Sequence, residues 1–147
     1  MSVFVTMFLS LSVAAEARAA HLPVLPVLVY HHIQEKVQSD VSCTPAQFES
    51  HISALKNAGF TPLTLAQTRL FLAGALTSVV RPVLITFDDG YESLFFYALP
   101  VAEKLQVPMT VFVVTSRIGR KPQFARYLTD AQIQKMAASG LFDFGSH

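Results

Sequence analysis

The chain has 147 residues, of which 52% are hydrophobic and only 14% are charged, and its formal net charge is +1 at pH 7. This length suits one domain or part of one, and the hydrophobic fraction is sufficient for a sizeable buried core. The near-neutral charge, without any run of basic residues, argues against partners such as nucleic acid or an anionic membrane surface.

The first twenty residues predict an export signal. An apolar stretch from Val3 to Ala15 precedes the small-residue sequence Ala17-Arg18-Ala19, which is typical of a signal-peptide cleavage site. We therefore expect residues 1–19 to be a signal peptide. The mature chain would then lie in the periplasm, at the cell surface or in the medium, and would have no transmembrane span. Because no Lys or Arg precedes the apolar stretch, an N-terminal helix packed on the domain is the alternative.

Three segments carry the signals that begin a helix. The capping residues are Thr44, Thr64 and Thr129. The first and third are each followed three residues later by a glutamine, which completes a capping box. We expect these helices to end at Gly59, Gly74 and Gly140, since glycine readily adopts the left-handed conformation that follows a helix.

A fourth helical segment is predicted over residues 92–106. Pro100 lies inside it and predicts either a kink or the start of a second helix. We interpret Phe95, Phe96 and Tyr97 as core residues of a helix that packs on the sheet, and not as a platform on which a sugar stacks.

Apolar, β-branched runs between the helices predict buried strands. They comprise Leu22 to Tyr30, Val83 to Phe87, Met109 to Ser116, and a last run that begins at Phe142, with a short extended piece around Phe60 to Leu63. Strands that alternate with helices predict βαβ units and a mostly parallel sheet. The expected fold class is therefore α/β.

Polar side chains stand where these strands end. The first strand runs into His31-His32, the second into Asp88-Asp89, the third into Thr115-Ser116 and the last into Ser146-His147. In parallel α/β folds the carboxyl ends of the strands share one edge, and active sites form there. An Asp-Gly turn alone would explain Asp89-Gly90 but would not explain the histidines.

Carboxylates and imidazoles gathered at one edge suggest a divalent metal site with hydrolytic chemistry. Both groups suit zinc or a similar first-row ion, and such a site activates water. Two neighbouring aspartates can divide the work, because successive side chains point in different directions: one binds the metal and the other serves as a base. A glycosidase fits less well, since its two carboxylates must flank a sugar.

Three stretches together resemble a known family. "VLITFDDGY" at residues 83–91, "YHH" at 30–32 and "MAASGLFDFGSH" at 136–147 resemble the polysaccharide deacetylases, carbohydrate esterase family 4. The branch that acts on poly-β-1,6-N-acetylglucosamine is the most similar, and its substrate is a biofilm polysaccharide. The resemblance implies a parallel-strand (β/α) distorted barrel, incomplete in this chain, with residues 20–147 as the N-terminal part of the catalytic domain.

The resemblance also implies roles for individual residues. Asp88 matches the catalytic base, and Asp89 and His147 match metal ligands, with zinc as the expected ion. By position, His31, His32 and Tyr91 are candidates for lining the site or binding substrate. The implied reaction is metal-dependent removal of N-acetyl groups from an N-acetylglucosamine polymer, which would be the partner of the protein.

The family pattern contains features that this sequence does not carry. A second histidine ligand is expected four residues past His147, and a further histidine that acts as the acid is expected later still. We therefore expect this chain, taken alone, to be inactive. The alternative is a non-catalytic, truncated relative that binds glycan or nothing.

Overall fold

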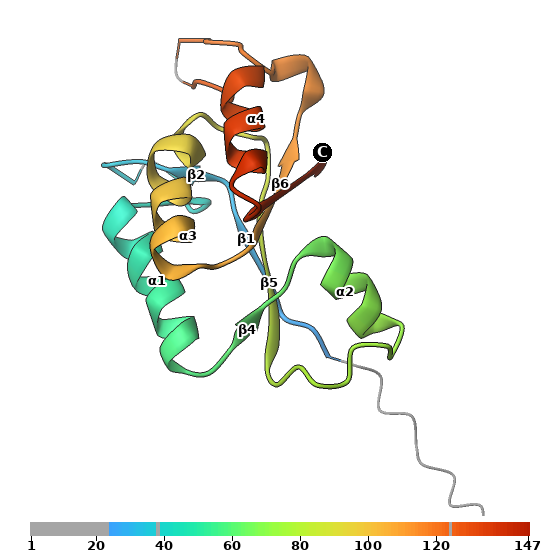
Figure 1. The fold of residues 1–147 in the computed structure, drawn as a ribbon. Helices are drawn as coiled ribbons and strands as arrows, with labels where there is room; N and C mark the ends of the chain where they lie inside the picture. Colours follow the sequence, from blue (N-terminus) through green and yellow to red (C-terminus); the bar gives the residue numbers. More distant parts are fainter. Residues whose placement is uncertain (1–23, 38, 124) are drawn as a thin grey trace, which may run out of the picture.

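The computed structural model describes residues 24–37, 39–123 and 125–147, so the predicted signal peptide at residues 1–19 lies outside the described residues. The main sheet is parallel, with strand order β1-β5-β6-β7, and a short strand, β4, pairs with the start of β5 (Figure 1). The strands are β1 (Val27–Tyr30), β4 (Thr61–Pro62), β5 (Pro82–Phe87), β6 (Met109–Val113) and β7 (Phe142–Ser146). The predicted parallel α/β class is confirmed.

Four α-helices and two short helical turns connect these strands. The α-helices are α1 (Pro45–Asn57), α2 (Leu65–Leu72), α3 (Leu99–Leu105) and α4 (Asp130–Ala138). A π-helical turn, η1 (Leu94–Ala98), precedes α3, and a 3₁₀ turn, η2 (Thr115–Arg117), follows β6. A separate two-stranded parallel ribbon joins β2 (His32–Ile33) to β3 (Ser42–Cys43).

The predicted helix starts are confirmed by the capping geometry. The side chains of Thr44, Thr64 and Thr129 each accept a hydrogen bond from the backbone N–H three residues later. The side-chain oxygen of the glutamine at that later position accepts a hydrogen bond from the backbone N–H of the threonine. Each such box satisfies donors that a helix start would leave unpaired. The three predicted terminal glycines have φ angles of 76°, 72° and 71°, as expected for residues that end a helix.

The third predicted strand is shorter than expected. We predicted Met109 to Ser116, but β6 ends at Val113 and the chain turns into η2. The backbone explains the early end, because the N–H of Val114 donates to the carbonyl of Asp89 at 3.4 Å and the N–H of Arg117 donates to the carbonyl of Val114 at 2.8 Å. These bonds direct the chain out of the sheet.

The predicted helical segment 92–106 is divided in two. Pro100 lies in the first turn of α3, so the proline begins a second helix, and the turn before it is π-helical. Phe95 and Tyr97 pack against the core as expected. The core assignment of Phe96 is wrong: its side chain is 56% exposed, because the wide π turn directs it outward.

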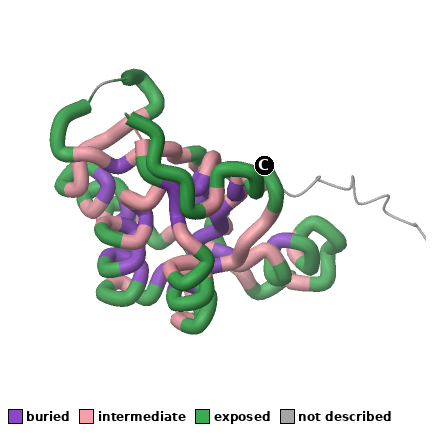
Figure 2. Tube along the Cα trace, turned by 90° about the horizontal axis from the view of Figure 1, so that it is seen from above, coloured by how far each residue is buried: buried purple, intermediate pink, exposed green. Residues whose placement is uncertain are grey.

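One face of the sheet carries the core. Helices α1, α3 and α4 cover this face, while α2 lies on the other side of β5 (Figure 1). Buried side chains fill the space beneath these helices, and the residues that carry them are coloured purple on the Cα tube in Figure 2. They include Phe48 and Ile52 of α1, Ile85 and Phe87 of β5, Val111 of β6, Ala102 of α3 and Met136 of α4. No helix among the described residues is long and apolar enough to cross a bilayer.

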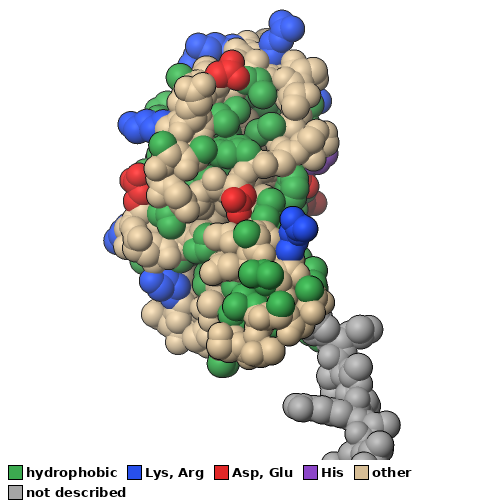
Figure 3. All heavy atoms as spheres, turned by 45° about the vertical axis from the view of Figure 1, so that its right-hand side comes forward, with side chains coloured by type: hydrophobic (Ala, Val, Ile, Leu, Met, Phe, Trp, Pro, Cys, Tyr) green, Lys and Arg blue, Asp and Glu red, His purple; other side chains and the backbone are tan. Residues whose placement is uncertain are grey.

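The opposite face of the sheet is less well covered. Strand pairing places Val29, Thr86, Thr110 and Asp143 in one row on this face, from β1 through β5 and β6 to β7. Val29 is 54% exposed, whereas Asp143 accepts a 2.8 Å hydrogen bond from the first backbone N–H of α2. A view from the side of α2 shows hydrophobic side chains at the surface with few charges among them (Figure 3).

Candidate functional site

Side-chain alternation along the strands explains how the site forms. His31 continues the row that contains Val29 of β1, and Asp88 continues the row of Thr86 in β5. His147 continues the row of Asp143 in β7. All three side chains therefore project from the carboxyl ends of their strands on the face opposite the core.

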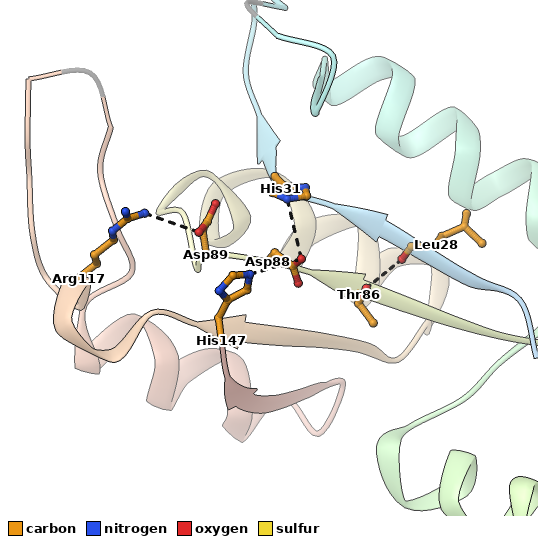
Figure 4. Close-up of polar contacts among 7 residues, drawn as sticks. All are labelled: Leu28, His31, Thr86, Asp88, Asp89, Arg117 and His147. Carbon is orange, nitrogen blue, oxygen red and sulfur yellow. Dashed lines mark hydrogen bonds and ion pairs between the residues drawn. The ribbon is translucent and has the colours of Figure 1, made fainter.

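Asp88 lies between the two histidines (Figure 4). Its Oδ2 atom is 3.9 Å from His31 Nε2 and 3.6 Å from His147 Nε2. The carboxylate side chain is 25% exposed, so it is accessible from solvent but partly shielded. A carboxylate with an imidazole on each side can accept a proton and can be oriented by its neighbours.

Backbone hydrogen bonds fix the two chain segments that meet here. The N–H of Asp88 donates to the carbonyl of Tyr30 at 2.9 Å, which joins the ends of β1 and β5. The N–H of His147 donates to the carbonyl of Val113 at 3.0 Å, which joins the ends of β6 and β7. The positions of both residues are therefore set by the sheet itself.

Asp89 interrupts the alternation of side-chain directions that β5 and Asp88 follow. Its φ angle is 67°, in the left-handed region that non-glycine residues seldom adopt, and its side chain turns away from His147 (Figure 4). Gly90 follows with a φ of 75°, and a Cβ atom at this position would lie 2.8 Å from Val113 Cγ1. Only glycine lets the turn pack this closely on β6. Backbone strain of this kind is concentrated at functional sites.

Arg117 of η2 holds the Asp89 side chain from the other side. Its Nη1 atom is 3.6 Å from Asp89 Oδ1 and donates a 3.0 Å hydrogen bond to the hydroxyl of Tyr127. The guanidinium also lies over the Tyr127 ring at 5.3 Å from its centroid. The Arg117 guanidinium therefore links the strained turn at Asp89 to Tyr127, in the segment that precedes α4.

A stack of rings borders the site. Tyr91 stacks between His32, at a centroid distance of 4.5 Å, and Tyr127, at 5.1 Å. Burial, together with the nearby Asp89 carboxylate and Tyr127, raises the pKa of Tyr91 to about 12. Burial lowers the pKa of His32, which favours the uncharged form of this stacked imidazole.

The structure brings together only part of the predicted set. It groups Asp88 with His31 and His147, and it places His32 and Tyr91 in the neighbouring stack. Imidazole and carboxylate are suitable ligands for zinc. However, no group of three or more His, Cys, Asp or Glu side chains is placed to hold a metal ion in the part of the chain that the structure describes. The described geometry does not fit a complete metal site.

Sequence reasoning missed Arg117 and Tyr127. Both residues follow β6 in segments whose sequence has no strand or helix pattern. The chain returns to Gly90, whose carbonyl accepts a 2.9 Å hydrogen bond from the N–H of Leu128, and this contact brings both residues to the turn at Asp89-Gly90. The one available signal was a positively charged residue near the end of a predicted strand, which is too common to select Arg117.

The fold and the strand-end aspartates define a parallel α/β domain, and comparison with known proteins shows what this domain is similar to. Residues 77–147 match the family model described as "Polysaccharide deacetylase". The relative YxkH of Bacillus subtilis is 33% identical over 117 residues, which cover 80% of this chain and 40% of YxkH. The poly-beta-1,6-N-acetyl-D-glucosamine N-deacetylase of Staphylococcus aureus is 28% identical over 120 residues, 81% of this chain and 41% of that protein.

Solved structures give the same result for the fold. IcaB from Ammonifex degensii superposes with a TM-score of 0.77 at 32% identity, over 84% of this chain and 52% of that one. The resemblance to the polysaccharide deacetylase family is confirmed, and so is the partial barrel. The chain spans about 40% of the length of the curated relatives that it matches.

Proposed function

We propose that this chain is part of a hydrolase that removes N-acetyl groups from an N-acetylglucosamine-containing polysaccharide. The observation that carries the proposal is the position of Asp88, between His31 and His147, at the shared carboxyl edge of β1, β5 and β7. Residues 20–147 would be the N-terminal part of the catalytic domain.

In the proposed reaction Asp88 acts as the base. It accepts a proton from a water molecule whose oxygen bonds to the acetyl carbonyl carbon. The tetrahedral intermediate then collapses with cleavage of the carbon–nitrogen bond, and the nitrogen takes up a proton. The products are acetate and a free amine on the sugar. His31 and His147 flank the carboxylate and would orient it toward the water.

We further propose that the reaction requires a divalent metal, with zinc favoured and with Asp89 and His147 as ligands. A bound metal ion would polarise the acetyl carbonyl and lower the pKa of water. This assignment rests on the ligand types and on the family resemblance, since the described side chains do not form a complete metal site.

Poly-β-1,6-N-acetylglucosamine is the favoured substrate, because the matched Staphylococcus aureus protein is named for its deacetylation. Export accords with such a substrate, and residues 1–19 are the proposed signal peptide. His32 and Tyr91 would line the site beside the sugar, where their stacked rings form one wall.

The test is acetate release from N-acetylglucosamine oligomers, with and without a chelator. We expect a protein that carries the whole domain to release acetate and to lose this activity when metal is removed. We expect the 147-residue chain alone to release none above the metal-free control. If the whole domain is also inactive with every oligomer and metal, the alternative of a non-catalytic glycan-binding relative replaces the proposal.

A further inference from the structure

A cavity of about 410 Å³ lies beside the ring stack. His32 belongs to both the stack and the cavity wall, so the cavity adjoins the candidate site without sharing its aspartates. Its volume is within the range of sites that hold one small molecule. The side chains that matter for its chemistry are His32, Glu35, Glu92, Phe96, Tyr97 and Arg126.

The π-helical turn η1 shapes one wall. Turns of this kind are rare and occur frequently at functional sites, because the widened backbone places side chains where a regular helix would not. Here the turn presents Phe96 and Tyr97 to the cavity. Phe96 keeps 56% of its surface exposed, so its ring is accessible to a ligand in the cavity.

The walls are tied to one another before any ligand binds. The N–H of Ile33 donates to Ser93 Oγ at 3.3 Å, and the hydroxyl of Tyr97 donates to Glu35 Oε1 at 3.2 Å. The N–H of Glu92 donates to the carbonyl of Arg126 at 2.8 Å. A cavity fixed by such bonds loses little conformational freedom when a ligand enters.

The two carboxylates of the cavity differ in what they can still bind. Glu92 is 13% exposed and already faces Arg126 at 3.9 Å and Gln132 at 3.2 Å. Glu35 is exposed, and its one hydrogen bond in the described structure comes from the uncharged Tyr97 hydroxyl. Its negative charge therefore remains available to a cation.

We propose that this cavity binds an amine-bearing hexose, the unit that deacetylation creates, and so holds the product end of the polymer beside the candidate site. The protonated amine would pair with Glu35 through a charge-assisted hydrogen bond and lie against the rings of Phe96 and Tyr97. An acetamido group carries no charge and gains neither interaction. The inference rests on the proposed function for the origin of its ligand.

The experiment measures, by calorimetry at low salt, how tightly the full chain binds two sugar trimers of the same linkage. One is an N-acetylglucosamine trimer, and the other is the same trimer with all of its N-acetyl groups removed. We expect tighter binding of the amine-bearing trimer. Glu35→Gln should weaken that trimer about fivefold, the upper range for an exposed ion pair, and leave the acetylated trimer unchanged. Glu103→Gln, which removes an exposed carboxylate of α3 outside the cavity, is the matched control and should change neither.

A second variant tests the ring. Phe96→Ala should weaken the amine-bearing trimer more than the acetylated trimer, because only the protonated amine gains the contact with the ring. The protein should stay folded, because this side chain is largely exposed. Equal affinity for the two trimers, or a preference that survives Glu35→Gln, would overturn the inference. Selective binding without acetate release by the whole domain would instead reject the proposed function and leave the amine-binding cavity in place.

Discussion

The two faces of the sheet differ in both covering and chemistry. Beneath α1, α3 and α4, side chains such as Ile85 and Phe87 are completely buried. On the other face Val29 is half exposed, and the side chains that continue this face past the ends of β1 and β5 are His31 and Asp88. Because adjacent residues of one strand serve opposite faces, stability and reactivity can be changed separately by substitutions one position apart.

The largest effect is expected from Asp88→Asn, which keeps the shape of the side chain and removes its ability to act as a base. In a protein that carries the whole domain, acetate release should fall by about 10²–10⁴-fold, with little change in the free energy of unfolding. Asp143→Asn is the matched control on the same face, because an amide oxygen can still accept the bond from the N–H of Leu65. Unchanged activity in Asp88→Asn would remove Asp88 from the mechanism.

Stability should respond mainly to the covered face. Phe87→Ala removes a ring with no exposed surface and should lower the free energy of unfolding by about 3–5 kcal/mol. Val29→Ala, on the other face of the neighbouring strand, should cost less than about 1 kcal/mol because its side chain is 54% exposed. Urea denaturation measures both, and similar losses would contradict the division between the faces.

Alanine substitutions at two glycines with nearly the same φ angle distinguish the cost of backbone strain from the cost of a steric clash. Gly59→Ala places a Cβ at a φ of 76° with no atom within 4 Å, so it should cost about 1–2 kcal/mol of unfolding free energy. Gly90→Ala has the same strain at 75° and also drives Cβ into Val113, which should add about 1–3 kcal/mol. If both variants lose the same amount, the turn does not depend on close packing against β6.

The smallest effect concerns the tyrosines. Tyr30 on the covered face and Tyr91 beside the site both have a pKa raised to about 12, in each case chiefly by burial. A raised folded-state pKa gives stability that is present below pH 10 and is lost as the pH rises toward 12. Tyr91→Phe should therefore remove one late phase from the tyrosinate absorbance titration and reduce the alkaline loss of stability. An unchanged titration above pH 11 would contradict the assignment for Tyr91.

Local signals in the sequence predicted much of the fold. The capping boxes at Thr44 and Thr129 act within four residues, so they can be recognised without tertiary information. The positions of His31, Asp88 and His147 at strand ends followed from the apolar runs and from the parallel class. Their grouping around Asp88 follows from alternation within the strands, once the strand ends are known.

Other features depend on contacts between distant segments. The exposure of Phe96 could not be predicted, because a π turn and a regular helix share the same apolar pattern. The early end of β6 depends on the turn at Asp89, which lies more than twenty residues earlier in the chain. The pairing of Arg117 with Asp89 arises from the same approach. The assignment of Asp89 and His147 as metal ligands stays a prediction.

The strand order has a consequence for the time course of folding. Val27 of β1 pairs with Leu84 of β5, more than fifty residues further along the chain. At a synthesis rate of about 5–20 residues per second, roughly three to eleven seconds pass between the synthesis of β1 and that of its partner, β5. During this interval its apolar residues have no strand to pair with, so an early contact with a chaperone would protect β1 more than any later strand of the sheet.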